Sequence, residues 1–329
     1  MYQTVGIAGA GAWGAALAFC AFSAGRKVRI WAREANVAEA MGSGLGNPVF
    51  LPGISLPAIE SSTDPGILRG CDAVLAVAPA QHLRASLGAF APFLEHGTPV
   101  ALCSKGIERG SLKLMTEVLA ETAPLASPAV LSGPSFAIDV ARGLPTAVTL
   151  ACRDRDEGEA WMASIGRPHF RTYWSDDLIG AEAGGAVKNV LAIACGVCEG
   201  LGLGRSAHAA LISRGFAEMT RFGVALGGRS ETLAGLCGLG DLVLTCSSPQ
   251  SRNMSFGMAL GQGRLAPDIL AERQGVTEGA ESAPAVVELA RRLGVDMPIC
   301  ETVERMIDGR LALSEAIAEL INRPFREEA

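Results

Sequence analysis

The sequence lacks an excess of positive charge, and this narrows its possible partners. Its 28 lysines and arginines are outnumbered by 34 aspartates and glutamates, and the net charge is −6. A general nucleic-acid binder or a protein that adheres to anionic membranes is typically basic instead. We therefore expect neither partner, and an anionic substrate would need a local cluster of basic side chains.

The chain also has no Pro- or Ser-rich linker, no internal repeat, no low-complexity tract and no block of like charges. Its 329 residues, 49% hydrophobic and 19% charged, exceed what one hydrophobic core usually accommodates. The sequence therefore predicts two globular domains that pack directly against each other.

A disulfide framework is not indicated either. The nine cysteines are odd in number, scattered and mostly set in apolar runs, which is typical of reduced thiols in a cytoplasm. Cys195 and Cys198 form a C-x-x-C pair, but further ligands at a zinc-like spacing are missing and the pair lies within an apolar helical run. We expect buried thiols, no metal site and a cytoplasmic protein.

The stretch Val5–Ala24 contains no charged residue over its length, so it could be mistaken for a membrane span or a signal peptide. No basic region precedes it, and glycines crowd its first half. A buried strand, a turn and a buried helix explain this composition better. We therefore expect no membrane span.

The secondary-structure pattern divides the chain at about Gly180. Before it, β-rich runs alternate with Ala- and Leu-rich stretches, which predicts a parallel sheet covered by helices. After it, the periodicity is helical. We predict an α/β protein with a parallel-sheet domain at 1–180 and an all-α domain at 181–329. The expected strands lie at 4–8, 27–31, 71–78, 98–104, 128–131, 146–151 and 170–174, and the expected helices at 14–24, 34–41, 81–94, 111–122, 207–226, 252–261, 281–293, 299–307 and 313–321.

Gly9, Gly11 and Gly14 form a G-x-G-x-x-G motif between the first strand and the first helix. In a dinucleotide-binding turn the first glycine allows the tight turn, the second lets the backbone approach a pyrophosphate, and the third lets helix and strand pack closely. The helix N-terminus offers free N–H groups to the phosphates. The sequence context favours this reading over a purely structural turn, and the N-terminal domain is predicted to be of the Rossmann type.

The end of the second strand bears on which nicotinamide cofactor binds. An arginine there accepts the 2′-phosphate of NADPH, whereas an acidic residue holds the ribose hydroxyl of NADH. Arg33 precedes Glu34 at this point. We expect NADPH to be preferred and NADH to remain possible.

Lys188 interrupts an apolar run within Ala181–Gly204. A helix that is apolar on all sides belongs in a core, where an ammonium must find partners or lose its proton. This makes Lys188 a candidate proton donor. From this segment alone, a lysine near a helix end that extends to water is an equally good interpretation.

Other polar residues follow apolar segments. Lys105 comes after a strand, at the carboxyl edge of the sheet where α/β domains bind ligands, and the turn 132–137 could offer backbone N–H groups there. A surface turn is the alternative for each stretch, and for 132–137 alone it is the better interpretation. Asp241 and Thr245 would share one face of a helix that begins after Gly240. Asp241 could alternatively cap that helix.

The run Ser251-Arg252-Asn253 begins another predicted helix. Hydrogen-bond donors and an arginine fork at a helix N-terminus suit a phosphate. An arginine exposed to solvent is the alternative.

Taken together, the motifs resemble the bacterial-type NAD(P)-dependent glycerol-3-phosphate dehydrogenases. The resemblance rests on GAGAWG, WAR, LPG, SKGIE, SGPSFA, GGAVKNV, ALISRGFAEM, GLGDLVLTC, SRN and TEG, which occur in one order along nearly the whole chain. It implies the reversible reduction of dihydroxyacetone phosphate to sn-glycerol 3-phosphate, which supplies glycerophospholipid synthesis. It also implies a Rossmann domain joined to a helical domain, and a homodimer.

The resemblance further implies residue roles. Lys188 corresponds to the family's catalytic lysine, and Asp241 and Thr245 correspond to residues that hold it. The implied substrate contacts are Lys105, Gly133, Ser135, Lys188, Asn189, Asp241, Ser251, Arg252 and Asn253, with Arg252 on the phosphate. The implied cofactor contacts are Gly9, Gly11, Ala12, Trp13, Gly14, Arg33, Phe50, Lys105, Ala137, Arg252, Val276 and Glu278.

Three positions depart from the family pattern. Ser206 stands where an asparagine is usual, His208 where a basic residue is usual, and Phe50 where many members have tyrosine or histidine. These departures put individual polar contacts in doubt, but they do not affect the proposed proton donor.

Two other functions fit part of the sequence. A related dehydrogenase of 3-hydroxy acids or acyl-CoA would share the cofactor turn, but such enzymes often use a His–Glu pair or another lysine. None of the four histidines lies in the apolar run around Lys188. A non-catalytic NADP-binding sensor would have no need for Lys188, Asp241 and Arg252 together.

Overall fold

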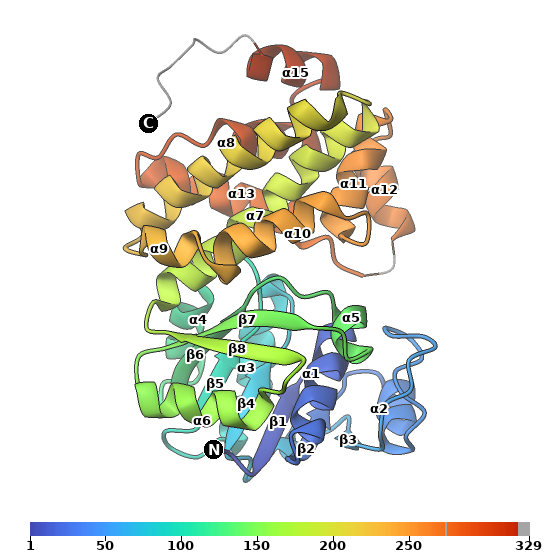
Figure 1. Ribbon diagram of the computed structural model, residues 1–329, viewed down its shortest axis with the longest axis vertical. Helices are drawn as coiled ribbons and strands as arrows, with labels where there is room; N and C mark the ends of the chain where they lie inside the picture. The colour runs from blue at the N-terminus through green and yellow to red at the C-terminus, as the bar shows by residue number, and fades with distance from the viewer. Residues whose placement is uncertain (274, 322–329) are drawn as a thin grey trace.

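The structure is a computed structural model that describes residues 1–273 and 275–321, in a sheet-containing half and a helical half (Figure 1). The N-terminal half holds an eight-stranded sheet in the order β3-β2-β1-β4-β5-β6-β7-β8. The strands are β1 (Thr4–Ala8), β2 (Lys27–Trp31), β3 (Glu60–Ser62), β4 (Ala73–Ala76), β5 (Pro99–Leu102), β6 (Ser127–Ser132), β7 (Thr146–Cys152) and β8 (Phe170–Ser175).

All seven predicted strands are present, but the sheet is not wholly parallel. Strand β7 runs antiparallel to β6, with Ser132 opposite Thr149. A turn and the five-residue helix α5 (Ala137–Ala141) connect these two strands, and an antiparallel pair needs no longer connection. The edge strand β3 was not predicted, because its sequence Glu-Ser-Ser has no apolar residue to signal a strand.

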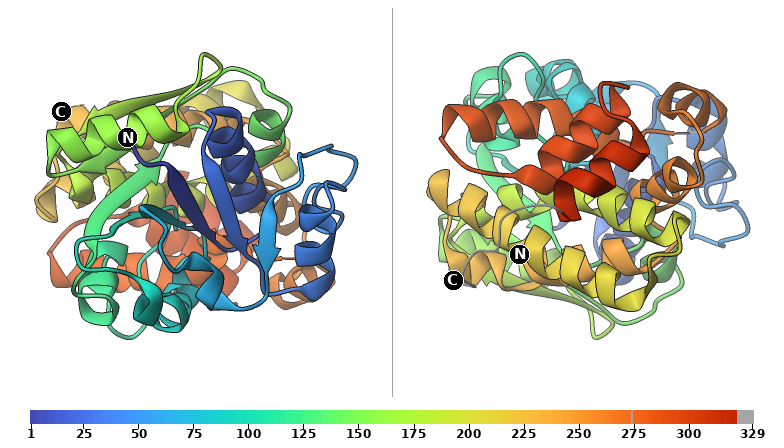
Figure 2. Two further views of the ribbon diagram at one scale, coloured as in Figure 1. Left: turned by 90° about the horizontal axis from the view of Figure 1, so that it is seen from below. Right: turned by 90° about the horizontal axis from the view of Figure 1, so that it is seen from above.

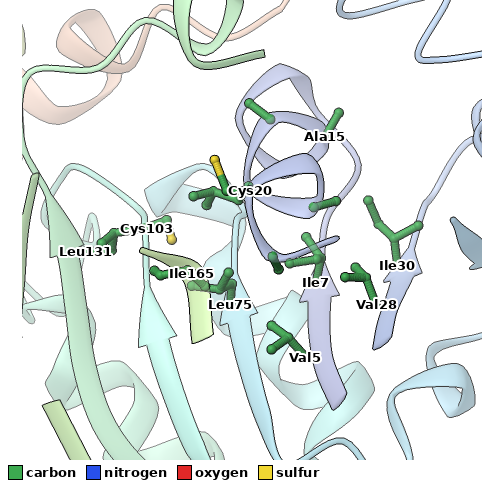
Figure 3. Close-up of a cluster of buried hydrophobic side chains, with 14 of the residues drawn as sticks. Val5, Ile7, Ala15, Cys20, Val28, Ile30, Leu75, Cys103, Leu131 and Ile165 are labelled. Carbon is green, nitrogen blue, oxygen red and sulfur yellow. The ribbon is translucent and has the colours of Figure 1, made fainter. Parts of the chain in front are cut away.

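Helices cover both faces of the sheet. They are α1 (Ala12–Ser23), α2 (Ala35–Gly42), α3 (Leu83–Phe90), α4 (Met115–Thr122) and α6 (Arg155–Ile165), with short 3-10 helices η1 (Pro65–Leu68), η2 (Ala80–His82) and η3 (Ala91–Phe93). Figure 3 shows α1 over one face, where Val5, Ile7 and Leu75 meet Ala15 and Cys20 in a closed core. The uncharged stretch Val5–Ala24 is therefore a buried strand, turn and helix, as predicted.

The helical half is built around α7 (Leu178–Gly200). The other helices are α8 (Gly204–Ala225), α9 (Ser230–Leu233), the π-helical turn η4 (Leu236–Gly240), α10 (Asp241–Ser247), α11 (Arg252–Gly261), α12 (Ala266–Glu272), α13 (Glu278–Arg292), α14 (Pro298–Ile307) and α15 (Leu313–Ile321). Figure 2 shows α8 and the last helices at the end of the molecule away from the sheet. The predicted all-α character is confirmed for the described residues; 274 and 322–329 of the predicted domain lie outside them.

By length and composition α7 could cross a membrane, and among the described helices it alone meets that criterion. However, 94% of its most apolar window is buried within the protein. Glycines explain how another helix covers it so closely. A Cβ at Gly196 would lie 2.1 Å from the carbonyl oxygen of Met254 in α11, and a Cβ at Gly257 would lie 2.0 Å from that of Ile193. The backbones of α7 and α11 are therefore in direct contact where the two helices cross.

The two halves share side chains across their boundary. Ile107, Leu112 and Leu114, which precede the predicted boundary at 180/181, lie in the hydrophobic core of the helical half. On the other side, Ala181 of α7 packs with Val130 of β6 in a small separate cluster. The nine cysteines are all buried free thiols.

Candidate active site

The glycine-rich turn after β1 has the geometry that a dinucleotide requires. Gly9 has a positive φ of 118°, and a Cβ there would lie 2.7 Å from the carbonyl oxygen of Val77. A Cβ at Gly14 would overlap the carbonyl oxygen of Gly9 at 1.8 Å, so helix α1 can cross the turn only at a glycine. A Cβ at Gly11 would meet no atom within 4 Å.

Space beside Gly11 is therefore open, while the other two glycines are packed by the fold. Helix α1 begins at Ala12 and no side chain caps its N-terminus, so its first N–H groups are available to an anion. Trp13 packs on the core, with its ring 6.3 Å from that of Phe170. These features fit a dinucleotide pyrophosphate at this turn.

Arg33 and Glu34, which were considered as contacts to the 2′-phosphate and to the ribose hydroxyl, form an ion pair with each other. The guanidinium of Arg33 donates from Nε and Nη2 to Glu34 Oε1, at 2.9 and 2.7 Å. The Arg33 side chain is 87% exposed. The Arg33 guanidinium is therefore accessible to a phosphate, while Glu34 neutralises part of its charge.

Asn47 links its own loop to the glycine-rich turn by hydrogen bonds. This residue was not among those predicted from the sequence. This buried amide donates from Nδ2 to the carbonyl oxygen of Ala10 at 2.8 Å and accepts from the N–H of Phe50 at 2.9 Å. Phe50 is thereby held near the glycine-rich turn, and the residue is 36% exposed. No motif signals Asn47, because its role depends on a contact with a turn far away in sequence.

The most distinctive cluster lies where the two halves meet. Lys105 follows β5 and Lys188 lies on α7, yet both contact one carboxylate, that of Asp241 at the start of α10. Lys105 Nζ donates to Oδ2 at 2.7 Å, and Lys188 Nζ donates to Oδ1 at 2.5 Å. Lys188 Nζ also lies 3.0 Å from Thr245 Oγ1, one turn along α10. The predicted cluster of Lys188, Asp241 and Thr245 is therefore assembled in space.

Burial sets the electrostatics of this cluster. The side chain of Asp241 is 1% exposed and that of Lys188 is 7% exposed. Burial, reinforced by the neighbouring ammonium of Lys105, lowers the pKa of Lys188 to about 8 against the pull of Asp241. Burial opposes the charge of Lys105 as well, but Asp241 outweighs it and raises the pKa of Lys105. Despite its own burial, Asp241 has a lowered pKa because both lysines stabilise its ionised form.

The chain beside this cluster presents a tight turn. Gly133 follows β6 with φ of 150°, its carbonyl oxygen lies 3.4 Å from Lys105 Nζ, and it accepts from Ser135 Oγ at 3.0 Å. Ala137 begins α5 directly afterwards. The structure thus brings this turn next to Lys105.

Asn189, adjacent to Lys188 on α7, belongs to a second polar network. Its Oδ1 accepts from Asn253 Nδ2 at 2.9 Å, and Asn253 Oδ1 accepts from the N–H of Gly279 at 2.9 Å. The side-chain Nδ2 of Asn189 is buried and has no hydrogen-bond partner among the described residues. A buried donor that has no partner among the described residues is suited to hydrogen bond with an acceptor on a ligand.

Two arginines, Arg252 and Arg273, lie at the N-terminus of α11. Ser251 caps this helix by accepting from the N–H of Met254 at 3.2 Å, and Arg252 begins it with an exposed side chain. Arg273, a residue that the sequence analysis missed, donates to the carbonyl oxygen of Arg252 at 2.6 Å. Burial, and then the charges of Arg252 and Arg264, lower the pKa of Arg273.

Val276 lies between α12 and α13, and Glu278 is the first residue of α13. Burial raises the pKa of Glu278, although Arg252, Lys105 and Lys188 act in the opposite direction. The charges of these three cations therefore all act on one carboxyl group.

The departures at Ser206 and His208 lie on α8. His208 is buried, its Nδ1 lies 3.8 Å from Glu199 Oε2, and that nitrogen has no hydrogen-bond partner among the described residues. Ser206 is exposed.

Comparison with known proteins gives a consistent result. Residues 4–158 match the family model of the NAD-dependent glycerol-3-phosphate dehydrogenase N-terminus, and residues 177–318 match that of its C-terminus. A glycerol-3-phosphate dehydrogenase (NAD(P)+) of Maricaulis maris is 62% identical over 99% of this chain and 98% of the relative, and that of Caulobacter vibrioides is 61% identical over 100% and 99%.

A crystal structure of glycerol-3-phosphate dehydrogenase from Coxiella burnetii has a TM-score of 0.93 to this chain at 38% identity, covering 98% of this chain and 99% of that one. The similarity in sequence and structure therefore extends through both halves. The chain belongs to the family of NAD-dependent glycerol-3-phosphate dehydrogenases.

Proposed function

We propose that this chain reduces dihydroxyacetone phosphate to sn-glycerol 3-phosphate with NADPH, or less efficiently with NADH, and that Lys188 is the proton donor. The observation that carries the residue assignment is the pair of lysines on one buried carboxylate, at the boundary between the cofactor half and the helical half. The similar proteins of Maricaulis maris and Caulobacter vibrioides are named glycerol-3-phosphate dehydrogenase (NAD(P)+), which supports the reaction and the cofactors. Glycerophospholipid synthesis is the pathway such a product would supply.

The cofactor site is proposed along the glycine-rich turn and its neighbours. Gly9, Gly11, Ala12, Trp13 and Gly14 would hold the pyrophosphate and Arg33 the 2′-phosphate. The nicotinamide end would extend past Phe50 and Ala137 toward Lys105, Arg252, Val276 and Glu278. NADPH, when bound, supplies the hydride that reaches the substrate carbon.

Side chains of the protein donate and accept the proton. In ketone reduction, the ammonium of Lys188 donates a proton to the carbonyl oxygen, and in the reverse direction the neutral amine removes it. A pKa near 8 suits this exchange near neutral pH. Lys105, whose pKa is raised, stays charged and stabilises the negative charge that develops on oxygen. Thr245 and Asp241 fix the ammonium in place.

The substrate would lie between the lysine pair and the N-terminus of α11. Asn189 has a buried donor free for a substrate oxygen, and Arg252 would form a fork on the phosphate. Gly133, Ser135, Ser251 and Asn253 would line the remaining sides. Asn253 already uses its amide within the protein, so its main effect would be to orient Asn189.

Loss of NADPH absorbance on addition of dihydroxyacetone phosphate tests the reaction directly. A folded protein that binds NADPH without turning over would instead be the sensor considered above. Turnover of a 3-hydroxy acid or an acyl-CoA in place of the phosphorylated ketone would favour the second dehydrogenase class. Each of these two outcomes contradicts the proposal.

We expect Arg252→Lys to raise KM for dihydroxyacetone phosphate by about tenfold or more, because a point charge cannot replace the bidentate fork. The KM for NADPH should change less. Steady-state kinetics with each substrate varied in turn measure both constants. Arg264→Lys, on an exposed arginine paired with Glu272, is the matched control. An unchanged KM for the ketone would refute the phosphate assignment.

We expect Arg33→Ala to lower kcat/KM for NADPH by about tenfold while that for NADH changes little, since only the former carries the 2′-phosphate. The comparison needs both cofactors with each variant. Arg155→Ala is the control, because Arg155 is a similarly exposed arginine paired with a glutamate. An equal loss with both cofactors would show that Arg33 does not read the 2′-phosphate.

We also propose that the enzyme acts as a homodimer in the cytoplasm, on the strength of the family resemblance. Analytical ultracentrifugation tests the dimer, and fractionation of cells tests the location.

A further inference from the structure

The two lysines reach Asp241 from different segments, so their separation depends on how these segments pack against each other. Lys105 belongs to the segment after β5, which continues to the start of α4 at Met115. Lys188 belongs to α7. Hydrogen bonds of 2.7 and 2.5 Å to opposite oxygens of one carboxylate leave little tolerance for a relative shift of these segments.

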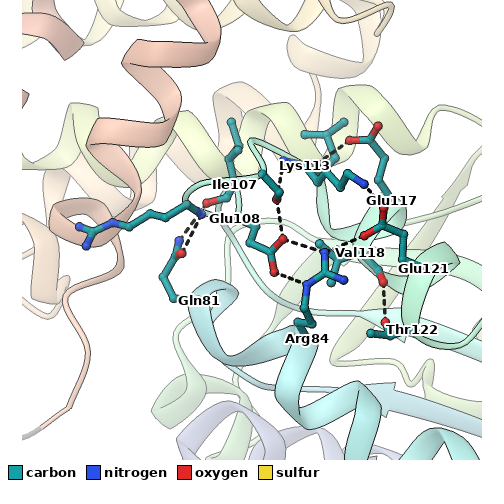
Figure 4. Close-up of polar contacts among 12 residues, drawn as sticks. Gln81, Arg84, Ile107, Glu108, Lys113, Glu117, Val118, Glu121 and Thr122 are labelled. Carbon is teal, nitrogen blue, oxygen red and sulfur yellow. Dashed lines mark hydrogen bonds and ion pairs between the residues drawn. The ribbon is translucent and has the colours of Figure 1, made fainter.

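Hydrogen bonds from Gln81 and Arg84 hold the segment from Lys105 to α4 (Figure 4). Arg84 donates from Nε and Nη2 to the two carboxylate oxygens of Glu108, each at 2.8 Å, and Gln81 donates to the carbonyl oxygen of Ile107 at 2.9 Å. Leu112 has a positive φ of 58°, a conformation that side chains other than glycine seldom adopt. The hydrogen bonds of Arg84 and Gln81 fix the segment to the sheet-containing half, whereas Leu112 and Leu114 pack in the hydrophobic core around α7.

Glu182 adds hydrogen bonds between this segment and α7 to that apolar packing. Its Oε1 accepts from the backbone N–H of Thr116 at 2.8 Å, and its Oε2 accepts from Thr116 Oγ1 at 2.7 Å. Thr116 lies in the first turn of α4, where backbone N–H groups have no partner within the helix and a carboxylate is favourably placed. Glu182 therefore caps α4 from another helix, the one that carries Lys188.

This contact is made by a carboxyl group that is 4% exposed. Burial raises the pKa of Glu182 to about 7, the two donors of Thr116 act to lower it, and the nearby carboxylate of Glu117 acts to raise it. An apolar side chain is often at least as stabilising as a buried ionisable one. Stability alone is therefore a poor reason for an acid here, whereas a directional contact between two segments is a good one.

We propose that Glu182 is a positioning residue that, through Thr116, sets α7 against the Lys105 segment so that both lysines meet Asp241. Glu182 does not contact the reacting atoms. The inference rests on the proposed function, because it is Lys188 as proton donor that needs this placement. It predicts that loss of the contact disturbs the proton transfer more than the binding of NADPH.

The test compares Glu182→Ala, Glu182→Gln and Thr116→Val with the wild type. A glutamine amide can accept from the Thr116 N–H and donate to its hydroxyl, so it preserves both contacts without a charge. Glu199→Ala, at the far end of the same helix, is the control. For each protein, kcat, both KM values, NADPH affinity by fluorescence and the pH dependence of kcat are measured, with thermal unfolding recorded separately.

We expect Glu182→Ala to lower kcat at least about tenfold and to displace the limb of the pH profile that reports the lysine pair, since small misplacements of catalytic groups are costly. Affinity for NADPH should stay within about twofold. Glu182→Gln should recover most of kcat, and Thr116→Val should show the same changes as Glu182→Ala in weaker form.

Unchanged kcat and pH profile in folded Glu182→Ala, with only a lower melting temperature, would overturn the inference. If that variant does not fold, unchanged kinetics in Thr116→Val would do the same. A glutamine variant as impaired as the alanine variant would also contradict the proposal. Absence of turnover by the wild type is a different result, since it would reject the proposed function itself.

Discussion

Replacement of Lys188 by alanine is expected to lower kcat for dihydroxyacetone phosphate reduction by about 10²–10⁴ while NADPH binding is nearly retained. The loss removes the group that donates a proton to the carbonyl oxygen, and general acid catalysis typically contributes this much. Lys188 lies against Asp241 and Thr245, away from the glycine-rich turn proposed for the pyrophosphate. Stopped-flow or steady-state kinetics give kcat, and fluorescence titration gives the affinity for NADPH.

Two further variants make this result specific. Lys188→Arg keeps a positive charge but cannot release a proton near neutral pH, so it should be nearly as inactive as the alanine variant. Lys27→Ala, at an exposed lysine on β2, should retain wild-type rates. An active Lys188→Ala would move the proton donor elsewhere, and an active Lys188→Arg would show that charge, not proton transfer, is what the position supplies.

Replacement of Asp241 by asparagine has the second largest expected effect. The carboxylate is almost fully buried between two ammonium groups, and removal of one member of such a buried set typically costs about 3–5 kcal/mol of stability. Part of this cost is avoided if Lys188, whose pKa is already low, gives up its proton. We therefore expect kcat to fall by about 10²–10³ because the donor is both unprotonated and unpositioned.

The pH dependence of kcat should shift in a definite direction when Asp241 is replaced. In the wild type, ketone reduction needs protonated Lys188, so kcat should decrease as pH rises through about 8. Without Asp241, burial and the charge of Lys105 act unopposed, and the decreasing limb should move to lower pH. Asp268→Asn, at an exposed acid in the first turn of α12, serves as the control. A limb that stays in place would contradict the shared-carboxylate interpretation.

The outline of the fold could be predicted from local sequence signals. The strands Thr4–Ala8 and Lys27–Trp31 have the bounds expected from their β-rich runs, and Arg252–Gly261 and Leu313–Ile321 have those expected from helical periodicity. These elements carry their own apolar pattern. Elements without such a pattern, such as β3, α9 and α12, were not predicted.

The site was predictable in its parts but not in its connections. The G-x-G-x-x-G turn is a local motif between one strand and one helix, so the sequence by itself predicted it. The contact of Gly9 with the carbonyl oxygen of Val77, which follows β4, is visible only in the tertiary structure. The sequence also placed Lys188 in a buried helix and Asp241 one helical turn from Thr245.

Only the tertiary structure decided between the two readings of Lys188. Its ammonium is not extended to water but is bound to Asp241, and the same carboxylate also binds Lys105. The pairing of Arg33 with Glu34 and the capping of α4 by Glu182 were equally hidden in the sequence. Each depends on side-chain direction or on segments distant along the chain, and neither periodicity nor spacing specifies these. The physical reason is that burial and shared partners, which set the pKa of a lysine, exist only after the two halves have packed.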